Sequence, residues 1–295
     1  MTSVLNFGSI NVDHVYNVEH FVRPGETLAC LDYRRHAGGK GLNQSIALAR
    51  AGARVYHAGK LGVADVWLKT LMAEQGVDTR FVETVTGVSG HAVIQVNAAG
   101  ENAIVIVGGA NRLINEMDVQ RIIAGFGPKD YLLVQNEINA VPQIIRAAKA
   151  QGLTVAFNPA PMTTAVLDYP LERVDMLIVN ETEAHSLTGE NEPEDIYASL
   201  RQRYPRMALI LTLGHQGAYY FGPQARHYQP AIQVQAVDTT GAGDTFTGFF
   251  LAELIETCDP KAALAFAARA AALCVTRPGA ADSIPSRREL EAQPC

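Results

Sequence analysis

The residues best suited to chemistry lie in the segment Asp238 to Thr245, which reads Asp-Thr-Thr-Gly-Ala-Gly-Asp-Thr. Its centre, Gly241-Ala242-Gly243, has little or no side chain, so a phosphate could approach the backbone N–H groups. The apolar run Phe246 to Ile255 is typical of a helix, and a helix N-terminus attracts anions. Asp244 would be repelled by phosphate and suits a general base acting on an attacking hydroxyl. These residues alone leave a second interpretation open, in which Asp244 caps the helix and the glycines form a tight turn.

A second polar segment, Ala37 to Gln44, reads Ala-Gly-Gly-Lys-Gly-Leu-Asn-Gln. Its glycines allow close approach to the backbone, and Lys40 and Asn43, with Asp13 nearer the N-terminus, supply the mixed donors and acceptors that a polyhydroxylated ligand needs. Lys40 is followed by glycine rather than serine or threonine, so this is not a Walker A loop. A solvated turn with a surface lysine is the alternative interpretation of the segment.

Length and charge narrow the classes of function. A chain of 295 residues suits one large α/β domain, residues 1–295, with a small appendage. The net charge of -6 argues against a nucleic-acid or anionic-membrane partner. The start of the chain lacks the pattern of a signal peptide and no apolar stretch is long enough for a membrane span, so we expect a cytoplasmic protein. Four scattered cysteines, expected to be reduced thiols, are Cys30, Cys258, Cys274 and Cys295.

Short β-rich runs alternate with helical patterns along most of the chain. The expected strands span residues 4–10, 55–59, 131–135, 154–157, 176–179 and 208–212. The expected helices span residues 41–51, 64–75, 142–150, 193–204 and 260–274, several of them bounded by glycine or proline. Alternation of this kind predicts an α/β fold, a three-layer α/β/α sandwich around a mostly parallel sheet, with ligands beyond the carboxyl ends of the strands.

Two regions interrupt the alternation, at about 12–35 and 88–107. In the second, the β-like runs 91–96 and 102–106 flank the turn 98–101. A few strands cannot stand alone, so they should cover something or pair with another chain. We therefore expect a small β lid, a dimer clasp, or both.

The two polar segments together resemble a known family. Gly38 to Ser45, with Gly52 and Gly62, resembles the first signature of the ribokinase-like (PfkB) carbohydrate kinases, and Asp238 to Asp244 resembles the second. Further segments stand in the family's order: 8–13, 24–27, 108–111, 158–161, 180–183, 212–214 and 275–280. The resemblance implies ATP-dependent phosphorylation of the 5-hydroxyl of a pentose, with D-ribose expected first, by a homodimer formed through the lid strands.

The resemblance also implies roles for individual residues. Those matching the sugar site are Asp13, Gly39, Lys40, Asn43 and Glu137, together with the base. Asp244 matches the catalytic base, and Gly241, Ala242 and Gly243 match an anion hole for the transferred phosphoryl group.

For the nucleotide and its metal ions, the resemblance implies further sites. The residues matching the ATP site are Asn180, Thr212, Gly214, Gly217, Gly243 and Arg269, the last at a position where asparagine or histidine is common. Asn180 and Glu183 match a pair of residues that influences Mg²⁺ and phosphate. The contact is expected to pass through water bound to the Mg²⁺ of ATP. A potassium site, K⁺ being a monovalent activator, is implied at Asp238, Thr240, Cys274, Arg277, Gly279 and Ser283.

Two other functions remain compatible with these residues. A kinase for another furanose or for a nucleoside would share the ribosyl-like acceptor. A sugar-binding regulator could have kept the fold and lost turnover, although such a protein has no use for the base Asp244. Sugar and ATP are the expected partners in the kinase interpretations.

Overall fold

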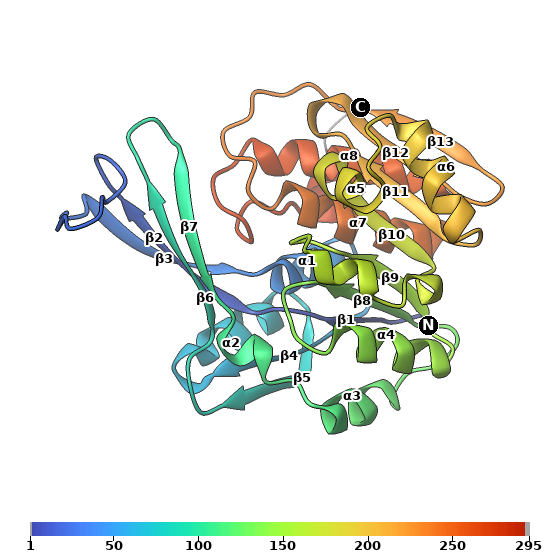
Figure 1. Ribbon diagram of the computed structural model, residues 1–295, viewed down its shortest axis with the longest axis horizontal. Coiled ribbons are helices and arrows are strands. Elements are labelled where there is room, and N and C mark those ends of the chain that lie inside the picture. The colour runs from blue at the N-terminus through green and yellow to red at the C-terminus, as the bar shows by residue number, and fades with distance from the viewer. Residues whose placement is uncertain (1, 293–295) are drawn as a thin grey trace.

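The computed structural model describes residues 2–292, in which a large sheet carries helices on both faces and a second, small sheet projects from one end (Figure 1). The large sheet has nine strands in the order β13-β12-β11-β10-β9-β8-β1-β4-β5. All neighbouring pairs from β11 to β5 are parallel, and β12 and β13 add an antiparallel edge. The predicted three-layer, mostly parallel α/β fold is confirmed.

The strands of the large sheet, in chain order, are β1 Val4–Phe7, β4 Val55–Gly62, β5 Asp78–Val85, β8 Tyr131–Gln135, β9 Thr154–Asn158, β10 Met176–Asn180, β11 Ala208–Thr212, β12 Gly217–Phe221 and β13 Arg226–Pro230. The α-helices are α1 Lys40–Arg50, α2 Val66–Glu74, α3 Glu116–Ile123, α4 Val141–Ala150, α5 Glu181–Thr188, α6 Pro193–Arg203, α7 Ala242–Thr257, α8 Pro260–Val275 and α9 Arg287–Ala292. Short 3₁₀ turns are η1 Val63–Asp65, η2 Gly109–Arg112, η3 Thr164–Asp168, η4 Leu171–Arg173 and η5 Gly214–Gln216.

The central strands are apolar on both faces because helices cover both. In β8, Leu133 points into a core formed with α1, α7 and α8, whereas Leu132 and Val134 point into a core formed with α3, α4 and α6. Side chains of successive strand residues alternate between faces, so a strand between two helical layers needs an apolar residue at nearly every position. Helices packed on both faces therefore bury the central strands and leave the loops at the strand ends to form a site.

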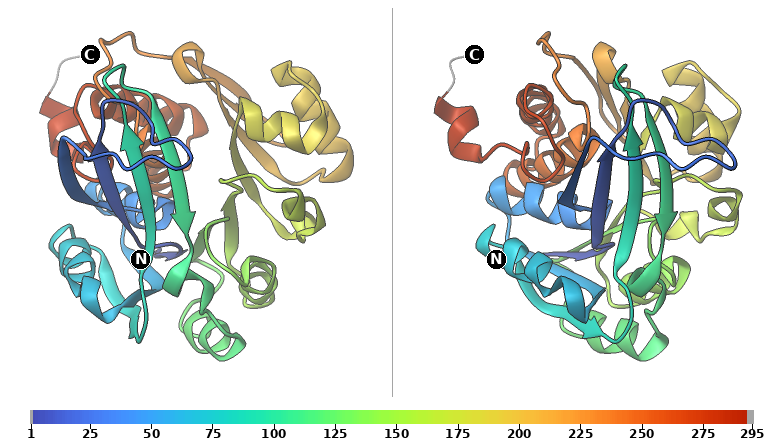
Figure 2. Two further views of the ribbon diagram at one scale, coloured as in Figure 1. Left: turned by 60° about the vertical axis from the view of Figure 1, so that its left-hand side comes forward. Right: turned by 90° about the vertical axis from the view of Figure 1, so that its left-hand side faces the viewer.

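The small sheet has the strand order β3-β2-β6-β7, with β2 at Asn11–Asn17, β3 at Asp32–Gly38, β6 at Gly90–Val96 and β7 at Asn102–Val107. Strand β2 pairs with β6 in parallel, and the outer pairs are antiparallel. This sheet projects to the left in Figure 1 and faces the viewer in the right-hand view of Figure 2. Strands β6 and β7 fall within the expected region 88–107, whereas β2 begins one residue before the expected region 12–35 and β3 ends three residues after it.

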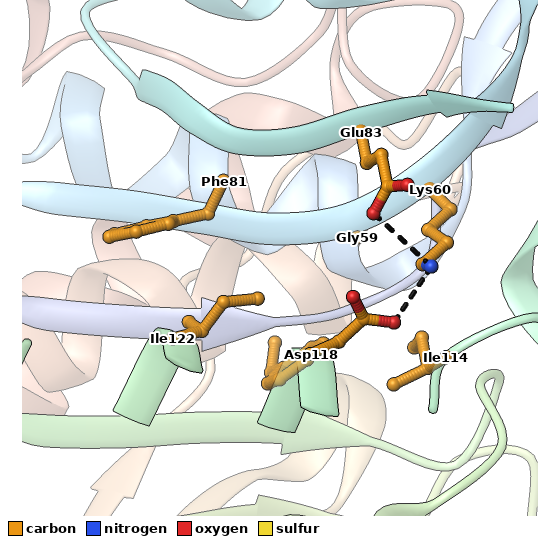
Figure 3. A pocket seen from close by; sticks show the side chains of 8 residues that line it. Gly59, Lys60, Phe81, Glu83, Ile114, Asp118 and Ile122 are labelled. Carbon is orange, nitrogen blue, oxygen red and sulfur yellow. Dashed lines mark ion pairs between the residues drawn. The ribbon is translucent and has the colours of Figure 1, made fainter. Parts of the chain in front are cut away.

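A buried ion pair ties the far edge of the large sheet together. Lys60 on β4, 6% exposed, lies 2.7 Å from Asp118 on α3 and 3.2 Å from Glu83 on β5 (Figure 3). Burial lowers the pKa of Lys60, but hydrogen bonds to the two carboxylates outweigh it and leave the pKa raised. Three elements that are separate in the sequence are thereby joined at one ammonium group.

Among residues 2–292, no helix is both long and apolar enough to cross a bilayer.

Candidate active site

The polar residues singled out in the sequence gather at the carboxyl ends of the parallel strands. Glu137 follows β8, Asn180 ends β10 and Thr212 ends β11. The N-termini of α1 and α7 face the same edge of the sheet, where open α/β folds bind ligands. Segments more than 200 positions apart in the chain therefore meet at one place.

Asp244 is the centre of this arrangement. It is the third residue of α7 and is 8% exposed. Its Oδ2 accepts a hydrogen bond of 3.0 Å from Nδ2 of Asn43, and its Oδ1 accepts one of 2.8 Å from Nε2 of Gln44. Both carboxylate oxygens are thus turned toward α1 and engaged there. The residue at the N-cap of α7 is Gly241, so the helix-cap interpretation of Asp244 does not describe this geometry.

The N-terminus of α7 presents an accessible backbone. Gly241 has φ of 76°, a left-handed conformation that favours glycine. A Cβ added to Gly243 would meet no atom within 4 Å, so the space in front of this residue is open. The first N–H groups of an α-helix have no partner within the helix, and an anion can receive them.

Acidic residues line the other side of the site. Glu137 Oε2 accepts hydrogen bonds from Ser9 Oγ at 2.5 Å and from the backbone N–H of Lys40 at 2.9 Å. Burial raises the pKa of Glu137. Burial and the nearby charge of Glu137 raise the pKa of Asp13, on β2, to about 6. A Cβ on Gly38 would lie 2.1 Å from an oxygen of Asp13, so only glycine leaves room for this carboxylate.

Lys40 balances these charges electrostatically. It is the first residue of α1, directly after Gly39, which has φ of 92°. The charges of Asp244, Glu137 and Glu183 raise the pKa of the Lys40 ammonium, with Asp244 the largest contributor. One cation therefore interacts with carboxylates contributed by three separate elements.

Asn43 provides an acceptor as well as a donor. Its Nδ2 is engaged by Asp244, whereas its buried Oδ1 has no hydrogen-bond partner among the described residues. A buried amide oxygen without a partner is costly, and a sugar hydroxyl could satisfy it.

Asn180 and Glu183 form a reciprocal cap at the start of α5. Oδ1 of Asn180 accepts from the backbone N–H of Glu183 at 2.8 Å, and Oε2 of Glu183 accepts from the backbone N–H of Asn180 at 3.0 Å. Burial raises the pKa of Glu183. The charge of Lys40 lowers this pKa and the charge of Asp244 raises it, and the pKa remains raised. The cap holds this carboxylate within electrostatic range of Asp244.

Of the residues matching the nucleotide side, Thr212, Gly214 and Gly217 lie along β11, η5 and β12. Thr212 donates from Oγ1 to the Val179 carbonyl at 3.3 Å, and Gly214 and Gly217 bound η5 with φ of 50° and 132°. Arg269 lies on α8 and donates from Nη2 to the Leu290 carbonyl of α9 at 2.5 Å. At least one side of its guanidinium is therefore directed toward the end of the chain.

The residues matching the cation site form two groups. In the first group, Asp238 joins its own loop to the segment after α8. Its Oδ1 accepts hydrogen bonds from the N–H and the Oγ1 of Thr240, at 2.9 and 2.6 Å, and its Oδ2 accepts one from the N–H of Gly279 at 2.8 Å. Burial raises the pKa of Asp238, but these hydrogen bonds outweigh it and leave the pKa lowered. The Asp238 side chain thus links the loop before α7 to the backbone at Gly279.

The second group is buried at the end of α8. Cys274 Sγ lies 3.1 Å from Ser283 Oγ, which donates to the Ala280 carbonyl at 2.8 Å. Arg277 contributes its side chain elsewhere, in an ion pair of 2.8 Å with Glu289. Within residues 2–292, no three His, Cys, Asp or Glu side chains gather as they would around a metal ion. Carbonyl and hydroxyl oxygens are what this region offers a cation.

Sequence reasoning missed the amides that surround Asp244 from behind. Gln44, Gln135 and Asn158 are buried; Gln44 hydrogen-bonds the carboxylate, and Gln135 and Asn158 each hydrogen-bond Gln44. Gln44 belongs to the first signature, but its partners come from strand ends whose register the sequence does not display. A polar residue ending an apolar strand, as in both Gln135 and Asn158, was the available signal.

Comparison with known proteins gives consistent relatives. A family model described as "pfkB family carbohydrate kinase" matches residues 1–287. A ribokinase of Haemophilus influenzae is 38% identical over 291 residues, covering 96% of this chain and 95% of the relative. A deoxyribokinase of Salmonella typhi is 33% identical over 292 residues, covering 95% and 94%. The solved structure of an Arabidopsis thaliana ribokinase complexed with ribose and ATP superposes with a TM-score of 0.88 at 33% identity, covering 99% of this chain and 98% of that one.

Proposed function

The chain belongs to the pfkB family of carbohydrate kinases, and on this premise we propose that it transfers the γ-phosphoryl group of ATP to the 5-hydroxyl of D-ribose, giving D-ribose 5-phosphate and ADP. The observation that carries the proposal is the carboxylate of Asp244, held by Asn43 and Gln44 beside the first turn of α7. The similarity to ribokinases along nearly the whole chain supports the choice of substrate.

In the proposed reaction, Asp244 accepts the proton of the 5-hydroxyl as that oxygen forms a bond to the γ-phosphorus. The bond between the γ-phosphorus and the β–γ bridging oxygen breaks, and ADP leaves. The N–H groups of Gly241, Ala242 and Gly243 act as the anion hole, and donors of this kind typically contribute about 3 kcal/mol each in the transition state. The open space at Gly243 supports this role.

The sugar hydroxyls are proposed to bind on the acidic side of the site. Asp13 and Glu137 accept hydrogen bonds from them, Lys40 and the backbone of Gly39 donate, and Asn43 offers its unpartnered Oδ1. Oriented carboxylates and amides suit a polyhydroxylated ligand, because each hydroxyl can both donate and accept.

The nucleotide is proposed to lie over β11 and β12. Thr212, Gly214, Gly217 and Arg269 bound this region, and Asn180 and Gly243 lie toward the phosphates. Asn180 and Glu183 use one oxygen each in their cap, so the second carboxylate oxygen of Glu183 remains for a water of Mg²⁺. Bound with ATP, Mg²⁺ neutralises charge on the phosphates and orients them.

A monovalent cation, K⁺, is proposed beside the anion hole. Asp238 and Ser283 would supply side-chain oxygens, and Thr240, Cys274, Arg277 and Gly279 main-chain oxygens, a donor set that suits a hard, weakly charged ion. The Asp238 hydrogen bonds to Thr240 and Gly279 support it, since they hold the two loops that the ion would bridge.

The small sheet is proposed to be a lid that also forms a homodimer. Asp13 lies on β2, and Ala92 and Ile106 occupy the same row on β6 and β7, so one face of the sheet looks toward the sugar. Edge strand β7 exposes Ile104, Val105 and Ile106 by 50%, 64% and 60%. An exposed apolar edge strand is expected to be covered by another chain.

A cytoplasmic location is proposed, because ATP is the phosphoryl donor and Cys30, Cys258 and Cys274 are free thiols. The fourth cysteine, Cys295, lies outside the described residues.

The competing substrate is another furanose, and 2-deoxyribose is the specific candidate, since the deoxyribokinase of Salmonella typhi is also a near-full-length relative. A site built to hydrogen-bond a hydroxyl rejects the analogue that lacks it, because its own polar groups are then left unpaired. Asp13, half-buried and carrying a raised pKa, would be such a group.

ADP release measured with ribose, 2-deoxyribose, fructose and inosine tests the proposal, with the phosphorylated carbon identified by phosphorus–proton coupling. We expect ribose to have the highest kcat/KM and the phosphate to be on C5. Preference for 2-deoxyribose or inosine would replace the substrate. Sugar binding without turnover of any of the four would indicate a regulator.

A further inference from the structure

Behind Asp244 lies a connected set of buried amides that the proposed chemistry does not use. Gln44 is fully buried, and its two amide hydrogens go to Oδ1 of Asp244 at 2.8 Å and Oδ1 of Asn158 at 3.1 Å. Its Oε1 accepts from Nε2 of Gln135 at 2.6 Å. Every part of the Gln44 amide is therefore engaged.

The direction of these hydrogen bonds is fixed by main-chain carbonyls at both ends. Asn158 donates from Nδ2 to the Ile178 carbonyl at 2.9 Å, so its Oδ1 must face Gln44. Gln135 Nε2 also donates to Oδ1 of Asn6 at 3.0 Å, and Asn6 donates from Nδ2 to the Gly41 carbonyl at 2.8 Å. A carbonyl only accepts, so neither terminal amide can turn over.

A rotated Gln44 amide would consequently be unfavourable. Its oxygen would face the oxygens of Asp244 and Asn158, and its NH₂ group would face that of Gln135. Two acceptor contacts and one donor contact would be left unpaired in a buried site, each at a cost comparable to a lost hydrogen bond. Gln44 can present only N–H to Asp244.

Resting on the proposed function, we propose that Gln44 is a positioning residue for phosphoryl transfer: with Gln135 and Asn158 it holds the Asp244 carboxylate in one rotamer. Asn43 engages the other carboxylate oxygen and also faces the sugar, whereas Gln44 is buried behind Asp244 and touches no substrate. Its effect should therefore fall on turnover and not on sugar binding.

Gln44→Met tests this role, because it keeps the length of the side chain and removes both donors. We expect kcat to fall by roughly 10- to 100-fold, the range for a misplaced reacting group, with KM for ribose within about threefold of wild type. Gln135→Met, which removes the donor to Gln44 together with the donor to Asn6, should lower kcat in the same way but more weakly.

Gln75→Met is the matched control: Gln75 is hydrogen-bonded to Arg50 at 2.9 Å at the end of α2, away from the site, and its kinetics should be unchanged. If Gln44→Met does not fold, Gln135→Met carries the test. A kcat within twofold of wild type, or a loss confined to KM, would overturn the inference.

Crystal structures of the unliganded Gln44→Met or Gln135→Met protein give a readout that needs no substrate. We expect the Asp244 side chain to leave its rotamer or to become disordered. An unchanged Asp244 would overturn the positioning role even if no sugar is turned over, whereas failure of wild-type turnover with a displaced Asp244 would overturn the proposed function alone.

Discussion

Asn43 Nδ2 lies 3.0 Å from Asp244 Oδ2, a contact that joins two polar segments 201 positions apart in the chain. Because this donor comes from α1 and the acceptor from α7, the carboxylate depends on how these two helices pack. They pack directly, through residues such as Gly248 of α7 against Ala47 and Leu48 of α1. The geometry of the base is thus a property of the helical layer.

Asp244→Asn should fold and bind ribose but lose about 10²- to 10⁴-fold in kcat, the range for a general base. The amide has no charge to accept a proton, and it must place an NH₂ group against a donor of Asn43 or Gln44. Steady-state kinetics and ribose titration by calorimetry measure the two effects. Turnover near the wild-type level would remove Asp244 from its role.

Ribose binding should weaken as the pH falls below about 6, because the pKa of Asp13 is raised from 3.8 to about 6 and a protonated carboxyl is a poorer acceptor for hydroxyls. KM for ribose, measured between pH 5 and 8, gives this dependence. A pH-independent KM would show that Asp13 does not bind the sugar in its ionised form.

The Asp13 carboxyl also makes the stability of the unliganded protein depend on pH, and a falling pH here raises stability although it weakens ribose binding. Its contribution is fully present below pH 3.8 and is lost as the pH rises through about 6, because the folded state retains the proton more tightly. Asp13→Asn should therefore stabilise the unliganded protein at pH 8 by about 3 kcal/mol, as measured by urea unfolding. The difference between variant and wild type should vanish near pH 4.

Lys60→Met should lower the free energy of unfolding by about 3 kcal/mol, because it removes the buried partner of the Asp118 carboxylate and leaves it only the exposed Arg121 at 3.5 Å. Turnover of the folded protein should be unchanged. Lys149→Met breaks a half-exposed pair with Asp175 and should cost less than about 1 kcal/mol. Equal losses in the two variants, measured by urea unfolding, would mean that burial of Lys60 is unimportant.

Replacing K⁺ with tetramethylammonium at constant ionic strength should lower kcat by roughly tenfold, equivalent to about 1.4 kcal/mol in the barrier. Asp238→Ala should remove most of the difference between the two salts, since it takes away the side chain that joins Thr240 to Gly279. Identical rates of the wild-type protein in both salts would exclude a potassium activator.

Val105→Glu should convert the proposed homodimer to a monomer, because it places a charge on the exposed edge strand β7. Sedimentation equilibrium of variant and wild type checks this. A wild-type protein that sediments as a monomer would remove the dimer, and the small sheet would act as a lid alone.

The central strands could be predicted from the sequence because burial on both faces makes them apolar throughout. The predicted spans 131–135 and 208–212 agree with β8 and β11 at both ends, and the β-like runs 91–96 and 102–106 lie within β6 and β7. Strand β5, which reads Asp-Thr-Arg-Phe-Val-Glu-Thr-Val, was missed because it is an edge strand with charged residues. Helix α7 begins four residues before its predicted apolar run, since glycines hide its first turn.

The site was predictable only in part, for a reason of geometry. The types and spacing of residues around Asp244 indicate a base and an anion hole. The partners of Gln44 depend on the parallel register that sets Gln135 beside Asn158, and no pattern within either segment carries that information. The packing of Arg35 over Trp67, 5.7 Å from the ring centroid, likewise joins β3 to α2 in a way that neither segment shows.

The short buried link between β1 and β2 has a practical consequence for protein engineering. Residues 8–10 connect the two sheets and are buried. Asn111 hydrogen-bonds the end of this link: its Oδ1 accepts from the Ile10 N–H at 3.0 Å, and its Nδ2 donates to Asn11 Oδ1 at 2.7 Å. Asp13 is two residues beyond that anchor, whereas the turns at 18–31 and 98–101 are at the far tips. Foreign peptides or affinity tags inserted at 98–101 should leave the sugar site undisturbed, which makes this tip a suitable place for surface display.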